Sequence, residues 1–349
     1  MKHGVMYYLS KGGVHKNIGD YIQSVAADQF MHATELIERE ELYKYAGGKT
    51  KVILNGWFMH YPRQFPPSDD VVPLFVAFHM RPKMASRLLT PATVAYMRKY
   101  GPVGCRDRTT AEILERHGVP AYFSNCLTLT LGRTFPRAPP AERRGVCFVD
   151  PLHSFTKRDA LFSLPWLLLH PVMAVRVFVK MLPQALYRES PAFKLCAFAM
   201  LGVFLRTYLT LFTKDLILSA EYYTHSVMEC IFTDEKSKFD YSRKMLERYS
   251  RARFCVTSRI HCALPCVAMG VPVVFVDAGD KNLGEGRFDG VLDLFNVAVA
   301  RRDRLEPHFD LPPGGKIGAD SEIPVKNDFR QYADALAAKC EAFAKDGEA

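Results

Sequence analysis

Short apolar segments alternate with helix-like stretches through the first part of the chain. The helix-like stretches begin near Tyr21, after Pro91 and at Thr109, and Gly118 closes the last of them. Alternation of this kind is typical of βαβ units and predicts a parallel sheet covered by helices. The apolar segments, each short enough for a buried strand, are Val5–Leu9, Val52–Leu54, Leu74–Phe78, Val103–Cys105 and Ala121–Phe123.

A second alternating series follows the proline-rich, basic stretch Arg133–Arg144. It contains a short helical pattern at about Ala263–Met269, and it ends in an amphipathic pattern between Asp328 and Lys345. We therefore predict an α/β protein with domains at residues 1–140 and 145–327 and a closing helix at 328–349. The strands expected in the second series are Val146–Val149, Leu216–Leu218, Phe254–Thr257 and Val271–Val276.

The interval from residue 156 to residue 214 is both apolar and basic. It has eight basic and two acidic residues, which is +6 of the formal +9 of the whole chain. Prolines and charges interrupt every candidate spanning helix except Leu195–Phe212, so helices lying on an anionic membrane surface fit better than helices that cross a membrane. The alternative is a set of core helices that enlarges the second domain. The apolar runs are Leu164–Leu169, Val172–Val179 and Leu195–Phe212.

Composition and short motifs limit the cellular compartment of the protein and the classes of reaction it can catalyse. Nine cysteines without a CxxC pair are expected to be reduced, buried residues of a cytoplasmic protein. The first residues lack the apolar segment of a signal peptide, so we expect a site that faces the cytoplasm. Neither GxxxxGK[ST] nor a strand-linked GxGxxG occurs, which argues against nucleotide hydrolysis and dinucleotide redox chemistry. The positive charge favours an anionic partner, and we expect no nucleic acid.

The segment Phe254–Val276 has the pattern strand, tight loop, short helix, strand. It places Ser258, Arg259 and His261 at the carboxyl end of a strand, where ligands of open α/β sheets bind. Helix amides and an arginine fork attract carboxylate or phosphate, and a histidine exchanges protons near neutral pH. We therefore expect Arg259 and His261 to be catalytic and Ser258 to contact substrate.

Other candidate substrate contacts have structural alternatives. Arg106 is expected to face the first cluster across an interdomain cleft, or else to pair with a neighbouring carboxylate. Asp20 either contacts substrate or caps a helix beginning at Tyr21, and Trp57 either stacks on a sugar or fills the core. The remaining candidates are Asn17 in a glycine-containing loop, Asn55 at a strand end, and His225, for which a surface turn is the alternative.

A metal site is not expected. His261, Cys262 and Cys266 are close in sequence, but a zinc site needs about four ligands. Both cysteines are flanked by apolar residues of one helix, so we predict that they pack in the core.

Several of these segments, in this order, resemble the polysaccharide pyruvyl transferase family between about Asn17 and Val276. The resemblance implies two Rossmann-like domains in a glycosyltransferase-B-like arrangement, phosphoenolpyruvate as donor substrate, a glycan diol or lipid-linked oligosaccharide as acceptor, and no cofactor. It also implies that Arg106, Arg259 and His261 engage the donor. The matching segments are Asn17-Ile-Gly-Asp-Tyr-Ile-Gln23, Leu54-Asn-Gly-Trp57, Val103-Gly-Cys-Arg-Asp107, Tyr223-Thr-His225, Thr257-Ser-Arg-Ile-His261 and Gly270-Val-Pro-Val-Val274.

The apolar basic interval departs from the simplest family pattern and forms a helical insertion in the second domain. The reaction implied by the resemblance adds sugar hydroxyls to C2 of phosphoenolpyruvate to form a pyruvate ketal, with His261 as acid or as base. Two alternatives remain. One is a glycosyltransferase that uses a sugar nucleotide, whose diphosphate Arg259 would hold, and the other is a non-catalytic glycan- or lipid-binding module at the membrane.

Overall fold

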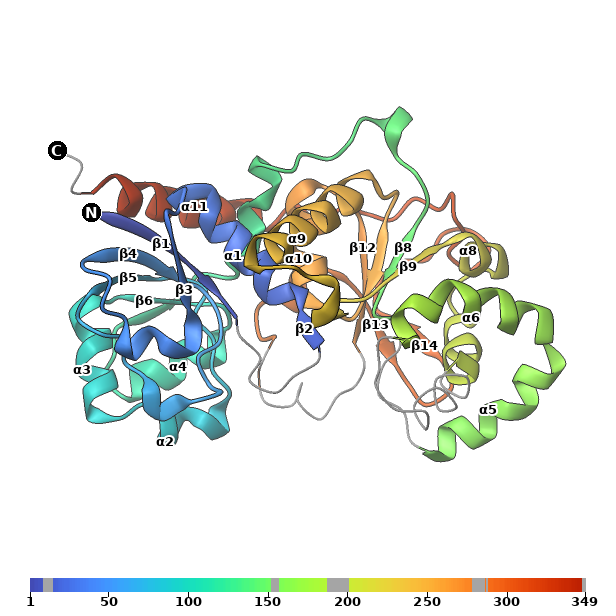
Figure 1. Cartoon of the computed structure of the whole chain (residues 1–349). Helices are drawn as coiled ribbons and strands as arrows, with labels where there is room; N and C mark the ends of the chain where they lie inside the picture. The colour runs from blue at the N-terminus through green and yellow to red at the C-terminus, as the bar shows by residue number, and fades with distance from the viewer. Residues whose placement is uncertain (9–14, 152–156, 187–200, 278–285, 287, 347–349) are drawn as a thin grey trace.

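The computed structural model describes residues 1–8, 15–151, 157–186, 201–277, 286 and 288–346. It is a mixed α/β structure in which two parallel sheets lie side by side with helices between them (Figure 1). The α/β class and the parallel sheets predicted from the alternating pattern are therefore confirmed.

The first sheet has the strand order β3-β1-β4-β5, and its strands are all parallel. The chain passes from β1 to β3 on one side and then to β4 on the other, so its direction of winding changes at β1. Backbone hydrogen bonds of Phe78 with Gly104 and Arg106 add the parallel pair β6-β7 beyond β5. The strands are β1 (Lys2–Tyr7), β3 (Glu35–Glu38), β4 (Thr50–Leu54), β5 (Val71–Phe75), β6 (Val103–Cys105) and β7 (Ala121–Phe123).

Four helices accompany this sheet. Helix α4 starts beside the end of β6, because Asp107 accepts a hydrogen bond from the amide of Thr110 and so caps it. The helices are α1 (Ile18–Met31), α2 (Ala85–Leu88), α3 (Pro91–Tyr100) and α4 (Arg108–Arg116).

The second sheet has the order β14-β13-β12-β11-β8-β9, parallel except for β14. Strand β8 is followed in sequence by β9 on one side and then by β11 on the other, so the direction of winding changes at β8. Ligands of open α/β sheets bind at such points. The strands are β8 (Cys147–Val149), β9 (Glu221–Tyr223), β11 (Cys255–Thr257), β12 (Val273–Asp277), β13 (Asn296–Ala300) and β14 (Leu305–Pro307).

One of the two hydrophobic clusters of the described residues joins the two halves. Helix α1 packs against α9 (Glu235–Arg251), and α10 (Ile260–Met269) packs against the 3-10 helix η4 (Leu127–Arg133). Strand β2 (His15–Asn17) pairs with β10 (Ser226–Met228). The C-terminal α11 (Arg330–Lys345) returns to the first half, where Lys51 Nζ donates to the carbonyl of Phe343. One apolar cluster includes residues from both sides of residue 140, so the predicted domain boundary there stays a prediction.

Three sequence predictions about local structure are wrong. Leu216–Leu218 is not a strand but part of α8 (Lys214–Ser219), because Thr213 caps a helix and three apolar residues fit either period. Helix α1 begins at Ile18 rather than near Tyr21, and its cap is Asn17 rather than Asp20. Cys230 is exposed, whereas the other described cysteines are buried and free.

The apolar basic interval divides into two kinds of helix. Leu164–Leu169 and Val172–Val179 lie in α5 (Lys157–Leu169) and α6 (Pro171–Leu186). Residues 195–200 of the third run lie outside the described residues, and the described part, from 201 to 212, is mostly buried against β8. Among described residues no single helix is long and apolar enough to cross a membrane. Leu161–Leu169 and Pro171–Met181 meet that test only as a pair bent by 111°.

Candidate functional site

Asp150 lies at the carboxyl end of β8, where the second sheet changes direction. Its Oδ2 accepts hydrogen bonds from Arg259 Nε at 2.7 Å and from the amide of His225 at 3.0 Å. Its Oδ1 accepts from Thr224 Oγ1 at 2.6 Å. These partners follow β11 and β9, the two strands that flank β8. One carboxylate therefore fixes the loops after both neighbouring strands.

The charge of Asp150 is stabilised by its partners. Burial alone raises its pKa, but the Arg259 guanidinium and the hydrogen bonds from Thr224 and His225 bring the pKa below its usual value. Asp150 is therefore ionised at neutral pH, and it holds the Arg259 side chain, which is 42 % exposed, through Nε. The Nη atoms make no hydrogen bond within the part of the chain that the structure describes.

Ser258 and Thr257 shape the loop before α10. Ser258 Oγ donates to the carbonyl of Asp150 at 3.1 Å. Thr257 Oγ1 donates to the carbonyl of Val149 and accepts from the amide of Arg259, both at 3.0 Å. Ser258 therefore ties the loop before α10 to the end of β8, and its contact with substrate stays a prediction.

Two histidines converge on the first turn of α1. A side chain at Gly19 would place its Cβ 3.2 Å from Nδ1 of His225 and 3.2 Å from Nδ1 of His261. The two ring nitrogens can therefore be no farther apart than twice that distance. Asn17 Oδ1 lies 3.1 Å from the same point and accepts from the amide of Gly19. A Cβ at this position would be tighter than ordinary packing against both imidazoles, which would have to shift by a few tenths of an ångström.

His225 is buried, not part of a surface turn. It is 1 % exposed, its Nε2 lies 2.9 Å from the hydroxyl of Tyr249, and its carbonyl accepts from the amide of Ile18. Burial lowers its pKa, against the opposing charges of Cys262 and Asp150. His225 is therefore neutral near pH 7 and joins the second sheet to the start of α1.

Asp20 links His225 electrostatically to two buried arginines. Its charge raises the pKa of His225, Arg106 and Arg39, in each case against the opposite effect of burial. The net pKa of Arg106 is lowered and that of Arg39 is raised. Arg106 is 3 % exposed, and its Nε lies 3.9 Å from Asp107 Oδ2, beyond hydrogen-bonding distance. The close ring partner of Asp107 is instead His79, at 2.6 Å.

Asn55 and Trp57 lie farther along the first sheet. Asn55 Nδ2 donates to the carbonyl of Gln23 in α1, so its amide supports that helix. Trp57 stacks on His60 with ring centroids 5.6 Å apart and lies under the guanidinium of Arg81. Within the described residues no ring contact or hydrogen bond joins Trp57 to the two histidines. Residues 9–14, including the glycines of the predicted loop before Asn17, lie outside the described residues.

Sequence reasoning missed Asp150 and Arg39. Asp150 has a left-handed backbone with φ 47°, and so do Asn125 and Ala77 after β7 and β5. Strained residues at strand ends are common in functional sites. The available signal was a polar residue directly after a short apolar run, as at Val149-Asp150.

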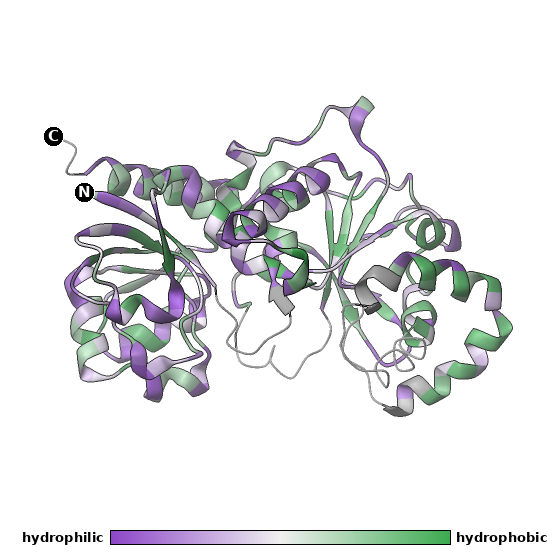
Figure 2. Ribbon diagram, in the orientation of Figure 1, coloured by the Kyte–Doolittle hydropathy of each residue, from purple (hydrophilic) through white to green (hydrophobic). Residues whose placement is uncertain are grey.

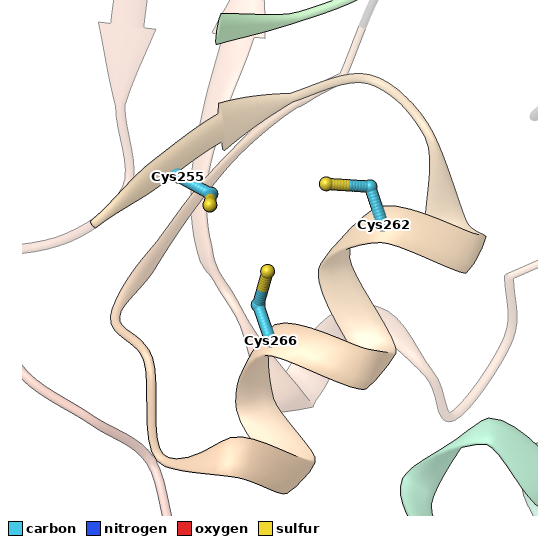
Figure 3. A group of neighbouring side chains, drawn as sticks. All are labelled: Cys255, Cys262 and Cys266. Atoms are coloured by element: carbon cyan, nitrogen blue, oxygen red, sulfur yellow. The ribbon is translucent and has the colours of Figure 1, made fainter. Parts of the chain in front are cut away.

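Three buried thiols lie behind this site. The Sγ atoms of Cys255, Cys262 and Cys266 are within 4.8 Å of one another, and they come from β11 and one face of α10 (Figure 3). Cys255 adds a thiol to the pair considered from sequence. Hydrogen bonding with Cys147 and burial raise the pKa of Cys255, and burial raises that of Cys266. Both effects favour protonated thiols at Cys255 and Cys266, whereas hydrogen bonds from these two thiols outweigh burial and lower the pKa of Cys262. The expected absence of a metal stays a prediction.

Comparison with known protein families identifies the family of this chain. A family model described as polysaccharide pyruvyl transferase matches residues 17–280, from the cap of α1 to just beyond β12. No curated protein matches the chain.

Proposed function

The chain belongs to the polysaccharide pyruvyl transferase family, which indicates pyruvyl transfer in polysaccharide biosynthesis, and from this premise we propose phosphoenolpyruvate as its donor. The acceptor is a sugar with two hydroxyls, free or lipid-linked, and the product is a pyruvate ketal. No cofactor is required. The enzyme works in the cytoplasm, where phosphoenolpyruvate is made.

The proposed architecture is two Rossmann-like domains in a glycosyltransferase-B-like arrangement. It is supported by two mainly parallel sheets, each of which changes its direction of winding at a central strand. Helix α1 belongs to the first sheet, and its N-terminal turn contacts His225 after β9. The start of α1 is therefore a meeting point of the carboxyl ends of both sheets.

The observation that carries the proposal is the convergence of His225 and His261 on the first turn of α1, with Arg259 held by the same Asp150 carboxylate that accepts from the amide of His225. Phosphoenolpyruvate has a carboxylate and a phosphate, and an arginine held by Nε offers its two Nη groups to one of them. The amides of a helix N-terminus favour negative charge at the same place. Arg106, buried and within the field of Asp20, is the proposed second anchor.

Proton transfer is assigned to His261. A proton adds to C3 of the donor, so that C2 becomes cationic and one sugar hydroxyl attacks it. The C2–O bond to phosphate then breaks, and a second hydroxyl attacks C2 and closes the ketal. Of the two hydroxyl protons, one balances the proton taken up at C3 and one leaves with phosphate or solvent. His225, neutral and tied to Tyr249, positions the first turn of α1 beside His261.

A donor screen tests the proposal. Purified protein is incubated with a panel of free and lipid-linked saccharides and either phosphoenolpyruvate or sugar nucleotides. The proposal is supported if phosphate is released from phosphoenolpyruvate only when an acceptor is present and the sugar nucleotides are not consumed. Consumption of a sugar nucleotide overturns it.

His261→Gln should bind donor normally and lose about a hundredfold to ten-thousandfold of turnover. Normal turnover by that variant would remove the acid–base role.

A further inference from the structure

Helices α5 and α6 expose an apolar corner of the second half, far from the first sheet (Figure 1, Figure 2). Of the thirteen large hydrophobic residues exposed in the described chain, eight lie between residues 161 and 179. We call this region the elbow. Its exposed residues are Leu161, Phe162, Leu164, Leu168, Leu169, Val172, Val175 and Val179.

Helix α6 is apolar on two opposite faces. Met173, Val177 and Met181 are buried in the cluster on the outer face of the second sheet. Val172, Val175 and Val179 follow the same helical spacing on the exposed side. An ordinary surface helix has polar residues there, and a contiguous exposed apolar patch marks an interaction site. The outer face of α6 is therefore not explained by packing within the described chain.

The charges of the elbow favour an anionic surface. No aspartate or glutamate occurs between Asp159 and Glu189, and Asp159 itself pairs with Arg302 at 3.2 Å. Arg176 is exposed beside the valines of α6. Lys180 contributes less, because its Nζ donates to the carbonyls of Leu218 and Ala220 at the end of α8. An exposed apolar face from a segment that contains cations but no carboxylate between residues 160 and 188 matches an anionic lipid leaflet.

The bend between α5 and α6 favours helices that lie on a membrane over helices that cross it. The helices are bent by 111° relative to each other, and each buries one face in the protein. Neither can leave that core without exposing it, so only the outer faces are available. We infer that the elbow inserts into one leaflet of an anionic membrane, with α5 and α6 lying along its surface. This inference deepens the proposed function, because it would bring the site to a lipid-linked acceptor.

Vesicle flotation tests the inference without any turnover. Wild type should float with vesicles containing phosphatidylglycerol, bind less to phosphatidylcholine alone, and keep part of its binding in high salt. Leu168→Gln/Leu169→Gln, at positions 81 % and 76 % exposed, should lower partitioning by about tenfold or more. The matched control Leu36→Gln/Ile231→Gln removes two exposed apolar residues elsewhere and should bind like wild type. Arg176→Gln should reduce the preference for anionic lipid.

Three outcomes would overturn the inference. In the first, wild type stays unbound with anionic vesicles at low salt, and in the second, the elbow and control variants bind alike. In the third, wild type is a dimer and the elbow variant is a monomer. The last result would make the face an interface between copies. Phosphate release from phosphoenolpyruvate with a soluble acceptor, measured in parallel, should be equal in wild type and the elbow variant. Failure of docking is therefore distinguishable from failure of the proposed chemistry.

Discussion

Replacing Asp150 by asparagine removes a charge while leaving the fold almost unstrained. Asparagine tolerates the left-handed backbone of φ 47°. Its carbonyl can take the place of Oδ2 and accept from Arg259 and His225, and its amide can face the hydroxyl of Thr224. Only the hydroxyl proton of Thr224, a partly buried residue, then loses its acceptor. What is lost is the charge that strengthens three hydrogen bonds and orients the guanidinium.

The expected loss of stability is small and the loss of activity is large. Charge-assisted hydrogen bonds are about twice as strong as neutral ones, and the ion pair with a 42 % exposed guanidinium adds little after solvent screening. We expect a loss of about 1–2 kcal/mol in the free energy of unfolding. A guanidinium displaced by about 1 Å should cost about a hundredfold in kcat/KM for phosphoenolpyruvate.

The assay compares kcat/KM and denaturant unfolding of Asp150→Asn with those of Asp320→Asn. Asp320 also pairs with an arginine, Arg253, but it is exposed and does not belong to the loops after β8, β9 and β11. The control should match wild type in both measurements. If Asp150→Asn retained wild-type kcat/KM, Arg259 would not depend on this carboxylate and the positioning role of Asp150 would be wrong.

Four further predictions follow from the same contacts. Gly19→Ala should keep near wild-type thermal stability but lose about tenfold or more in kcat, since its Cβ would press on His225 and His261; normal kcat would mean that the rings need no contact with α1. Arg259→Lys should lose most of kcat/KM for the donor in a folded protein, because lysine lacks the planar fork; unchanged kinetics would remove Arg259 from the donor site. Because the pKa of His225 is lowered in the folded protein, the unfolded state binds more protons below about pH 6.5. The free energy of unfolding should therefore fall on acidification by up to about 1.4 kcal/mol per pH unit. If the free energy of unfolding of His225→Gln fell equally steeply with pH, the prediction would be wrong. Elemental analysis should find only sub-stoichiometric zinc or copper, and one equivalent lost in Cys255→Ser would reverse the prediction that the thiols only pack.

The sequence predicts the strand, loop and helix around Arg259 well, because a buried apolar run, polar loop residues and Gly270 mark each boundary. It does not distinguish helix from strand at Leu216–Leu218, where three apolar residues fit both periods and the cap at Thr213 decides. Asp150 was missed because its importance comes from strand order: only in the folded sheet does β8 lie between the strands that precede His225 and Arg259. Local sequence does not encode that order.

The elbow is a second feature that the sequence predicts only in part. Its apolar and basic composition was evident from the sequence, but which apolar residues face outward was not. The run that looked most like a membrane helix is, in its described part, packed against Phe148 through Phe204, Tyr208 and Phe212. The exposed face lies instead on the shorter, proline-interrupted runs of α5 and α6.

The central claim is acid-assisted addition of sugar hydroxyls to phosphoenolpyruvate, and turnover in deuterium oxide tests it most directly. The pyruvylated saccharide is isolated and its methyl group is analysed by NMR and mass spectrometry. The account predicts a cyclic ketal whose methyl group contains one deuterium from solvent, formed together with one phosphate, and no such product with His261→Gln. A product that keeps a methylene group, or a sugar transferred from a nucleotide with phosphoenolpyruvate unused, would contradict it.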